Sequence, residues 1–463
     1  MGYRIEKDSM GEFRVPEDAL YGAQTARAVE NFPVSGAGIG REMIKALGLI
    51  KYAAAEVNRE LGKLAPEISD AIQRAAQEVI DGKLDAHFPV DVFQTGSGTS
   101  SNMNANEVIA NRAIQLLGGR IGSKTPVHPN DHVNMGQSSN DVFPSAIHVA
   151  ALIMIEQRLL PSLTRLQAEL ENKAIQFDAI VKTGRTHLQD ATPIRLGQEF
   201  SGYASQVAHG IAHIKDAVPH LSELAIGGTA VGTGINTHPE FGRRMAQKLS
   251  ALAGVSFIEA GNHFEAQAAR DAAVQMSGAL KTVAASLIKI ANDLRFLGSG
   301  PRLGLGELII PPVQPGSSIM PGKVNPVIAE SLIMAAAQAI ANDAAITLAG
   351  LYGNFELNVM LPLIAKNLLE QISLLANASR NFADKLVAGL QADRARIADL
   401  NEKSLALATA LAPVIGYDRA AEIAKQAYAA GKTVREVARD KKILPDDELD
   451  AILDLKKQTE PGE

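Results

Sequence analysis

The chain has 463 residues, enough for two or three domains, and a formal net charge of -6. That charge, together with the lack of a long basic run, argues against nucleic acid as a partner. The absence of cysteine excludes disulfides, thiolate-bound metals and cysteine nucleophiles. Aromatic residues make up only 4%, whereas alanine is abundant, which predicts an all-α fold of helices packed through small side chains.

The first segment, MGYRIEKDSMGEFRVPED, has no apolar core and carries acidic residues, unlike a secretory or transit peptide. The most apolar stretch runs from Ser331 to Tyr352, but Gln338, Asn342 and Asp343 interrupt it. We expect this stretch to form a helix buried on nearly all sides rather than a membrane span. These features together predict a cytoplasmic protein.

Three zones follow along the chain, and we predict a domain for each: 1–138, 139–392 and 393–463. The first mixes a loop-rich start with shorter helices. The second carries apolar patterns far longer than three helical turns, which predicts a bundle of long, nearly parallel helices. The third is smaller and more charged. The helices expected are Glu42 to Leu61, Ile68 to Ile80, Val142 to Ala174, Pro193 to Ala217, Phe264 to Leu297 and Pro326 to Ala349.

Helix start signals support this division. Thr192–Pro193 and Asn325–Pro326 each place a capping residue before a proline at the first helical position. Ser139, Asn140 and Asp141 are likewise suited to cap the helix that follows them.

Four polar, glycine-rich segments interrupt the helices, and each joins small polar side chains to an expected helix start. Taken singly, each is typical of a helix cap. Together they are the places where a site could lie. They are Gln94 to Asn106, His128 to Asp141, Thr183 to Pro193 and Gly316 to Pro326.

The fourth segment, GSSIMPGKVNP, invites comparison with a phosphate-binding loop. Its spacing has one residue too many, and Val324 stands where a hydroxyl should bind magnesium, which argues against a nucleotide site. What remains is a loop with hinge glycines at 316 and 322, adjacent hydroxyls at 317 and 318, and Lys323 beside a helix N-terminus. Because helix N-termini favour anions, we expect a carboxylate-binding lid.

His187 lies among Thr186, Gln189 and Asp190, just before an expected helix start, and is the histidine best placed for catalysis. On spacing alone a surface or capping role stays open. No cluster has zinc-ligand spacing, and the acidic residues are dispersed along the expected helices, so we expect no metal and no cofactor.

GSSIMPGKVNP resembles the signature of the fumarase/aspartase superfamily, whose members eliminate across a C–C bond next to a carboxylate. The similarity extends from YGAQTARAVENFP near the start to GNFELNVMLPLIAKNLL at 353–369 and fades in the last zone. Four motifs resemble the class II fumarases in particular: TGSGTSSNMNANEV, VHPNDHVNMGQSSNDVFP, GRTHLQDATP and GGTAVGTGINTHPE.

The resemblance implies roles for individual residues. Ser317 matches the general base that removes a proton from C3 of malate, and His187 matches the second acid/base group. Glu330 matches an acidic partner of that histidine in another subunit. Residues that match the substrate-binding set are Ser97, Gly98, Thr99, Ser138, Ser139, Asn140, Thr186, Ser318, Lys323, Val324 and Asn325. A secondary dicarboxylate site would fall at His128, Pro129, Asn130 and Asp131.

The resemblance further implies an all-α, three-domain fold and a homotetramer with a twenty-helix central bundle, whose active sites are each built from three chains. The activity implied is the reversible hydration of fumarate to L-malate in the tricarboxylic acid cycle. Proton removal next to a carboxylate develops negative charge, so preorganised donors, each worth about 3–4 kcal/mol, suit this reaction. General acid–base help would add on the order of 10²–10⁴-fold.

Some positions depart from the family pattern. Thr125 and Pro126 precede the secondary site where many relatives carry a basic residue, and Ser100 replaces a common glutamine. Tyr21 and Phe93 stand where fumarases often have tryptophan. The nearest rival is aspartate ammonia-lyase, which resembles this pattern with glutamine in place of His187. A non-catalytic scaffold, the other alternative, would need none of the matched catalytic residues.

Overall fold

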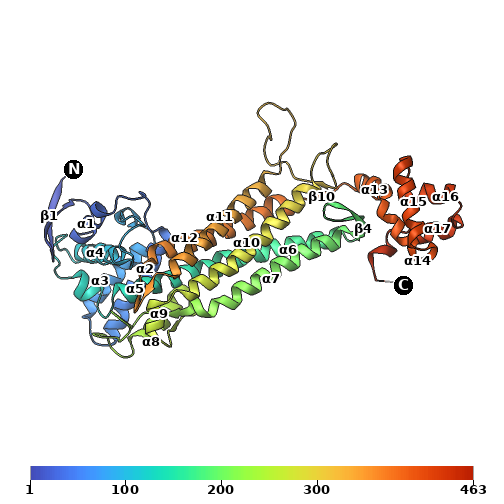
Figure 1. Cartoon of the computed structure of the whole chain (residues 1–463). Coiled ribbons are helices and arrows are strands. Elements are labelled where there is room, and N and C mark those ends of the chain that lie inside the picture. The colour runs from blue at the N-terminus through green and yellow to red at the C-terminus, as the bar shows by residue number, and fades with distance from the viewer. Residues whose placement is uncertain (1, 462–463) are drawn as a thin grey trace. The chain divides into compact units, whose positions relative to one another are not determined.

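The computed structural model describes residues 2–461, and most of them are helical (Figure 1). Every sheet among these residues has only two strands, so the predicted all-α class and helical bundle are confirmed. The chain divides into two compact units, each made of three segments. Unit 1 comprises Met1–Pro161, Ala212–Ala284 and Ala336–Ala376, and unit 2 comprises Ser162–Ile211, Ala285–Ala335 and Asn377–Glu463.

Unit 1 begins with a β-hairpin, followed by helices whose apolar faces pack on one another. The helix α2 (Arg41–Glu60) packs against α3 (Pro66–Ile80), and both confirm the helices expected there. Gly48 permits this close packing, because a Cβ atom there would lie 3.1 Å from the side chains of Val79 and Ile80. The remaining early elements are β1 (Tyr3–Asp8), β2 (Gly11–Pro16), α1 (Ala23–Asn31), η1 (Asp85–His87), α4 (Thr99–Leu116) and η2 (Pro129–Val133).

A long helical stretch starts at the end of the second polar segment. It consists of α5 (Ser139–Met154), the π-helical η3 (Ile155–Leu159) and α6 (Leu160–Gln176), so the long helix expected here is confirmed. Its N-cap is Ser138 rather than one of the three residues expected to cap it. Asp141 completes a capping box with Ser138 by accepting a hydrogen bond from its backbone N–H.

Like α6, further long helices contribute residues to both units: α7 (Leu196–Ser222), α10 (Asp271–Leu297), α11 (Val327–Gly350) and α12 (Leu361–Phe382). The expected start of α7 at Pro193 is wrong, because residues 193–195 belong to a strand, β4 (Gln189–Arg195). The expected helix from Phe264 to Leu297 is also interrupted, since α9 (His263–Ala268) ends before α10 begins. Smaller elements of unit 1 are β5 (Glu223–Leu224), α8 (Phe241–Ala253), β6 (Ile258–Glu259), β8 (Gly353–Asn354) and β9 (Leu357–Asn358).

The helix α11 differs from its prediction in burial. Its 24 residues are apolar enough to span a membrane by length and composition, as are those of 139–176, yet only 39% of its apolar window is buried within the chain. Met334 and Leu348 are 67% and 59% exposed. A helix buried on nearly all sides is therefore wrong for the single chain, and α11 presents an uncovered apolar face.

Unit 2 contains the hairpin of β3 (Val181–Thr186) and β4, and a C-terminal group of short helices with its own apolar core. Leu411, Ala427, Val434 and Leu449 are fully buried in that core. The short strand β7 (Leu308–Ile309) pairs with β10 (Gln391–Ala392) ahead of this group. The other elements are η4 (Ala383–Val387), α13 (Arg394–Lys403), η5 (Leu405–Leu411), α14 (Ala412–Ile415), α15 (Tyr417–Ala430), α16 (Val434–Asp440), α17 (Asp446–Ile452) and η6 (Lys457–Thr459).

Candidate active site

In unit 1 the N-termini of α4 and α5 meet through their hydroxyl groups. Thr99 Oγ1 lies 2.7 Å from Ser139 Oγ and 2.8 Å from Ser97 Oγ, so the three hydroxyls form a continuous hydrogen-bonded row. Gly98, the N-cap of α4, has a φ of +73°, and a Cβ atom there would lie 2.2 Å from the ring of Phe143. Only glycine fits this position, which brings the two helix starts together.

A buried carboxylate fixes the start of α5 against loop 227–230. Asp141 Oδ1 accepts a hydrogen bond from Ser138 N at 2.9 Å, and Oδ2 accepts two from N–H groups of that loop at 3.1 and 2.9 Å. The Asn140 side chain donates to a carbonyl of the same loop at 2.8 Å. Hydrogen bonds thus hold both predicted binding residues in place: Ser138 through Asp141, and Asn140 through the loop.

Thr99, Ser138 and Ser139 border a cavity of about 540 Å³. Where the structure describes its walls, they are uncharged, and most are hydroxyls, amides and glycine backbone. Two helix N-termini beside such a cavity favour an anion, because the positive end of each helix dipole lies at its N-terminus. The lining residues are Ser9, Gln24, Thr99, Asn102, Met103, Asn130, Asn134, Gly136, Gln137, Ser138, Ser139, Thr229, Ala230, Ile235 and Asn236.

A buried lysine that the sequence analysis did not single out lies behind this wall, together with Asp141. Lys51 Nζ donates to Asn134 Oδ1 and Gln137 Oε1, both at 2.9 Å, and so orients two amides of the cavity. Burial lowers the pKa of Lys51 to about 7, against the opposing charge of Asp141. Burial raises the pKa of Asp141 to about 6, although its N–H donors and Lys51 lower it. The sequence signal that could have identified Lys51 is a lysine within an otherwise apolar stretch of an expected helix.

The predicted secondary site lies on η2 in the same unit. His128 is its N-cap, and Nδ1 accepts hydrogen bonds from the N–H groups of Asn130 and Asp131, both at 3.2 Å. Nδ1 also lies 3.3 Å from Asp131 Oδ2, a contact that is attractive only when Nδ1 carries a proton. The two N–H donors favour the unprotonated Nδ1, which leaves Nε2 as the donor. Pro129 is buried, and Asn130 reaches the cavity described above.

In unit 2, His187 lies at the tip of the β3–β4 hairpin, so its expected position before a helix start is wrong. Thr186 pairs with Gln189, which leaves His187 and Leu188 as a two-residue turn. Both have positive φ, +56° and +61°, a conformation that costs non-glycine residues energy and is concentrated at functional sites. Thr186, His187 and Leu188 are exposed, and His187 is therefore accessible to a ligand.

The Gly316–Pro326 loop in unit 2 closes on itself. Gly316 N donates to Lys323 O at 2.9 Å, and the Asn325 side chain donates to Gly316 O. A Cβ atom at Gly316 would lie 2.3 Å from Lys323 O, so this closure needs glycine. Gly322 has a φ of +80°, and residues 322–326 border a cavity of about 590 Å³. The second half of the loop therefore lies beside open space.

The Ser317 hydroxyl is surrounded by backbone donors. Its Oγ accepts hydrogen bonds from Met320 N at 2.9 Å and from Ile319 N at 3.2 Å. Two N–H groups directed at one oxygen stabilise negative charge on it. Ser317 and Ser318 are half-buried, Lys323 and Val324 are exposed, and Glu330 is exposed in the first turn of α11.

The predicted site residues thus fall into two groups. The hydroxyl and amide groups of 97–99, 128–131 and 138–140 belong to unit 1, and the structure brings most of them to one cavity. The candidate acid, base and cation, at 187, 317 and 323, belong to unit 2 together with 186, 318, 324, 325 and 330. Each unit alone carries half of the expected chemistry.

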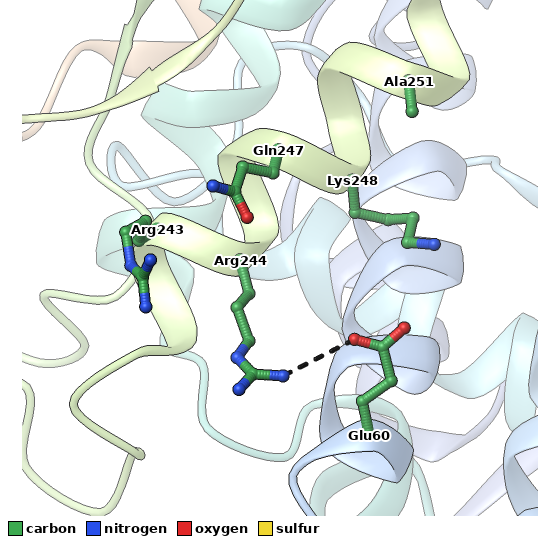
Figure 2. Close-up of a pocket in the computed structure, with 6 residues that line it drawn as sticks. All are labelled: Glu60, Arg243, Arg244, Gln247, Lys248 and Ala251. Carbon is green, nitrogen blue, oxygen red and sulfur yellow. Dashed lines mark ion pairs between the residues drawn. The ribbon is translucent and has the colours of Figure 1, made fainter.

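Figure 2 shows a different concave surface in unit 1, with a volume of about 380 Å³, where α8 faces α2. Its three cations are already paired. Arg243 and Arg244 contact Glu240 at 2.9 and 2.6 Å, Arg244 also faces Glu60 at 3.8 Å, and Lys248 contacts a glutamate of α2 at 2.7 Å. Because three carboxylates offset three cations, this surface does not offer a dianion the unbalanced positive charge that it needs.

Residues 11–341 match the protein family described as Lyase, and residues 407–460 match the family described as Fumarase C C-terminus. The chain is similar to fumarate hydratase class II of Halobacterium salinarum, with 58% identity over 99% of this chain and 98% of that protein. It is similar to mitochondrial fumarate hydratase of Danio rerio, with 56% identity over 94% of this chain and 86% of that protein. Its structure is similar to that of class II fumarase from Schistosoma mansoni, with a TM-score of 0.96, 42% identity and complete coverage of both chains.

Proposed function

This chain belongs to the class II fumarate hydratases and catalyses the reversible hydration of fumarate to L-malate, and we propose that Ser317 is its general base. Ser317 takes the proton from C3 of malate, and in the reverse direction it returns that proton to fumarate. A neutral serine hydroxyl is a poor base, because its basic form, the alkoxide, is scarcely populated at neutral pH. The observation that carries the proposal is the pair of N–H groups, from Ile319 and Met320, that donate to Oγ and stabilise the alkoxide.

His187 is the second acid/base group, acting on the hydroxyl that leaves C2 directly or through water. Its exposed position at the tip of a strained turn supports this role, because the ring is presented to a ligand rather than packed in the core. Glu330 of another subunit orients the ring. His187 also favours fumarate hydratase over aspartate ammonia-lyase, because aspartate ammonia-lyase resembles this chain with glutamine at position 187.

The two carboxylates of the substrate are held by different parts of the assembly. The hydroxyl row and helix N-termini of unit 1 receive one carboxylate through neutral donors. Lys323 and Asn325, with Thr186 and Ser318, receive the carboxylate next to C3, where negative charge develops during proton removal. Every step uses side chains and backbone N–H groups, so the proposed chemistry requires no metal or cofactor.

The active site is assembled between subunits of a homotetramer. The cavity of unit 1 has neutral donors, whereas the acid, base and cation belong to unit 2, which supports a site completed by other copies of the chain. The uncovered apolar face of α11 supports a central bundle of helices from four chains. We further propose three domains divided at 138 and 392, a cytoplasmic location, and a secondary dicarboxylate site at 128–131 that would use His128 Nε2.

Substrate assignment is tested by an ultraviolet assay of the purified protein, following fumarate formation from L-malate with L-aspartate in a parallel cuvette. We expect rapid turnover of malate alone. Ser317→Ala should lower kcat by about 10²–10⁴-fold, the usual range for general acid–base groups. Ser318→Ala is the matched control, since it removes the neighbouring hydroxyl and should change binding more than kcat. A Ser317→Ala protein with near-normal kcat would remove Ser317 as the base.

The shared site is tested by mixing two inactive chains. One carries Ser317→Ala, and the other carries Ser139→Ala with Asn140→Ala. If units of different chains build each site, mixed tetramers contain some sites with no substitution, and co-expression should restore activity well above that of either parent. Mixed tetramers that stay as inactive as their parents would show that each site comes from one chain.

A further inference from the structure

The only charge that contacts the polar wall of the unit 1 cavity from behind, among the residues that the structure describes, is that of Lys51. This lysine on α2 is completely buried, and its Nζ donates to Asn134 Oδ1 and Gln137 Oε1, both at 2.9 Å. Asn134 and Gln137 both border the cavity. The ammonium group therefore lies one hydrogen bond behind two residues of the cavity wall.

Lys51 differs from Lys182, which is similarly buried, in having no contact with a carboxylate. Lys182 lies 3.2 Å from an oxygen of Glu199 and 3.2 Å from an oxygen of Glu307. Within the described part of the chain, both hydrogen-bond partners of Lys51 are neutral amides. Asp141 favours the charged form of Lys51 without forming an ion pair with it. The positive charge of Lys51 is therefore not cancelled by a contact ion pair.

The two amides that bind Lys51 are held in one orientation. Their oxygens face the ammonium group, and their NH2 groups face backbone carbonyls. The NH2 group of Asn134 donates to Gln137 O at 3.1 Å, and that of Gln137 donates to two carbonyls of residues 133–137, at 3.1 and 3.2 Å. This segment leads directly to Ser138, the N-cap of α5. Lys51 thus anchors the chain where it enters the hydroxyl-lined helix start.

The burial of this charge has a cost in stability. Desolvation lowers the pKa of Lys51 to about 7, and a methionine would fill similar space without that cost. The described walls of the cavity are themselves uncharged. Because screening is weak inside a protein, a buried cation attracts an anion that it does not touch. An ammonium group in this place therefore suits anion binding better than it suits packing.

We propose that Lys51 is a positioning residue for the substrate carboxylate bound in unit 1, which holds the amides of Asn134 and Gln137 in place and supplies the positive charge that the cavity walls lack. This role rests on the carboxylate site proposed above for unit 1. Lys51 touches neither the substrate nor the reacting atoms. All the groups involved belong to unit 1 of one chain, so the role is independent of which subunits supply the acid and the base.

The kinetic signature of this role follows from where charge develops. The carboxylate bound in unit 1 keeps the same charge throughout the reaction, whereas negative charge develops at the carboxylate next to C3. An interaction that is equally strong with bound substrate and transition state affects KM and leaves kcat unaltered. Lys51 should therefore act on KM, in contrast to Ser317, which should act on kcat.

The test replaces Lys51 by methionine in the full-length protein. We expect KM for L-malate to rise about 10-fold, while kcat changes by less than about 3-fold. The matched control is Lys173→Met. Lys173 is also buried and donates to neutral oxygens, Gln176 Oε1 at 2.9 Å and Leu390 O at 2.8 Å, but it belongs to unit 2. That control should keep the KM of the unsubstituted protein.

A second variant tests the same role from the side of the cavity. Gln137→Met removes one of the two amides through which Lys51 acts, and should raise KM about 3-fold or more. When Gln137→Met is added to Lys51→Met, KM should rise by less than about 2-fold further, because the hydrogen bond between the two residues is already lost. If Lys51→Met does not fold, the KM of Gln137→Met alone decides.

The outcomes are distinct. An unchanged KM in folded Lys51→Met or in Gln137→Met, or a loss of kcat as large as the rise in KM, would overturn the positioning role and leave the proposed function intact. Independent effects of the two substitutions would also overturn it. If Ser139→Ala with Asn140→Ala left the activity unchanged, the carboxylate site itself would fail, and the role of Lys51 with it.

Discussion

The titration of Lys51 makes the free energy of unfolding depend on pH. The size of this dependence can be calculated, and a substitution of Lys51 should remove it. The residue is completely buried in α2, and burial lowers its pKa from 10.5 to about 7 in the folded chain. Between these values the unfolded chain binds a proton that the folded chain does not. The free energy of unfolding therefore rises with pH across this window, and levels off above the unfolded pKa.

The size of the effect follows from 1.36 kcal/mol for each pKa unit. From pH 7.5 to 9.5 the contribution of Lys51 rises by about 2.5 kcal/mol for each chain. Asp141 has the opposite sign: burial raises its pKa from 3.8 to about 6, so its contribution falls as pH rises between those values. Its window lies below the one chosen here and does not cancel the effect of Lys51.

The perturbation is Lys51→Met, which keeps the length of the side chain and removes its titration. The free energy of unfolding is measured with urea at fixed protein concentration for both proteins. Between pH 7.5 and 9.5 it should rise by about 2.5 kcal/mol more for the original protein than for the variant. Lys63→Met, at an exposed lysine just after the same helix, is the control and should follow the original protein. Parallel pH dependences for the original protein and Lys51→Met would refute the reasoning.

Three further predictions concern local structure around the site. Gly98→Ala should destabilise the protein by about 3 kcal/mol or more, because the added Cβ would clash with Phe143. The control is Gly62→Ala, where φ is +68° but the space is open, and it should cost about 1 kcal/mol. Equal urea midpoints for the two variants would contradict this prediction. Leu188→Asn should stabilise by about 0.5–1 kcal/mol, because asparagine tolerates positive φ, and a lower thermal midpoint would count against a strained turn. Thr99→Val should lower kcat/KM about 10-fold with an unchanged midpoint, and an unaltered kcat/KM would deny this hydroxyl a role.

Much of the helical scaffold could be predicted, because long apolar patterns and terminal signals are local properties of the sequence. The helices at 41–60 and 66–80 begin and end within two residues of expectation. The predicted start of α7 was wrong. Thr192–Pro193 has the residue types of a helix start, but it lies in β4, where pairing with β3 decides the conformation. Strand pairing depends on residues distant in sequence, so a cap signal alone could not reveal it.

The sequence motifs named candidate site residues but could not give their arrangement in space. The motifs identified the hydroxyl groups of 97–99 and 138–140, and the structure places most of them at one cavity. The charges of Lys51 and Glu307 were missed because neither lies in a motif or at an expected helix start. Their burial becomes visible only when the segments around them are folded together.

Buried charges in this chain support both the fold and the segments that are proposed to bind the substrate. Burying an ionised group costs stability, so the fold retains it where hydrogen bonds must fix a definite geometry. Glu107 does this for structure, since it accepts hydrogen bonds from the start of α1. Lys51 with Asp141, and Lys182 with Glu307, instead lie behind segments that carry polar groups proposed to act in the reaction. Binding residues can then stay accessible at the ends of elements, because the rigidity they need comes from the charges behind them.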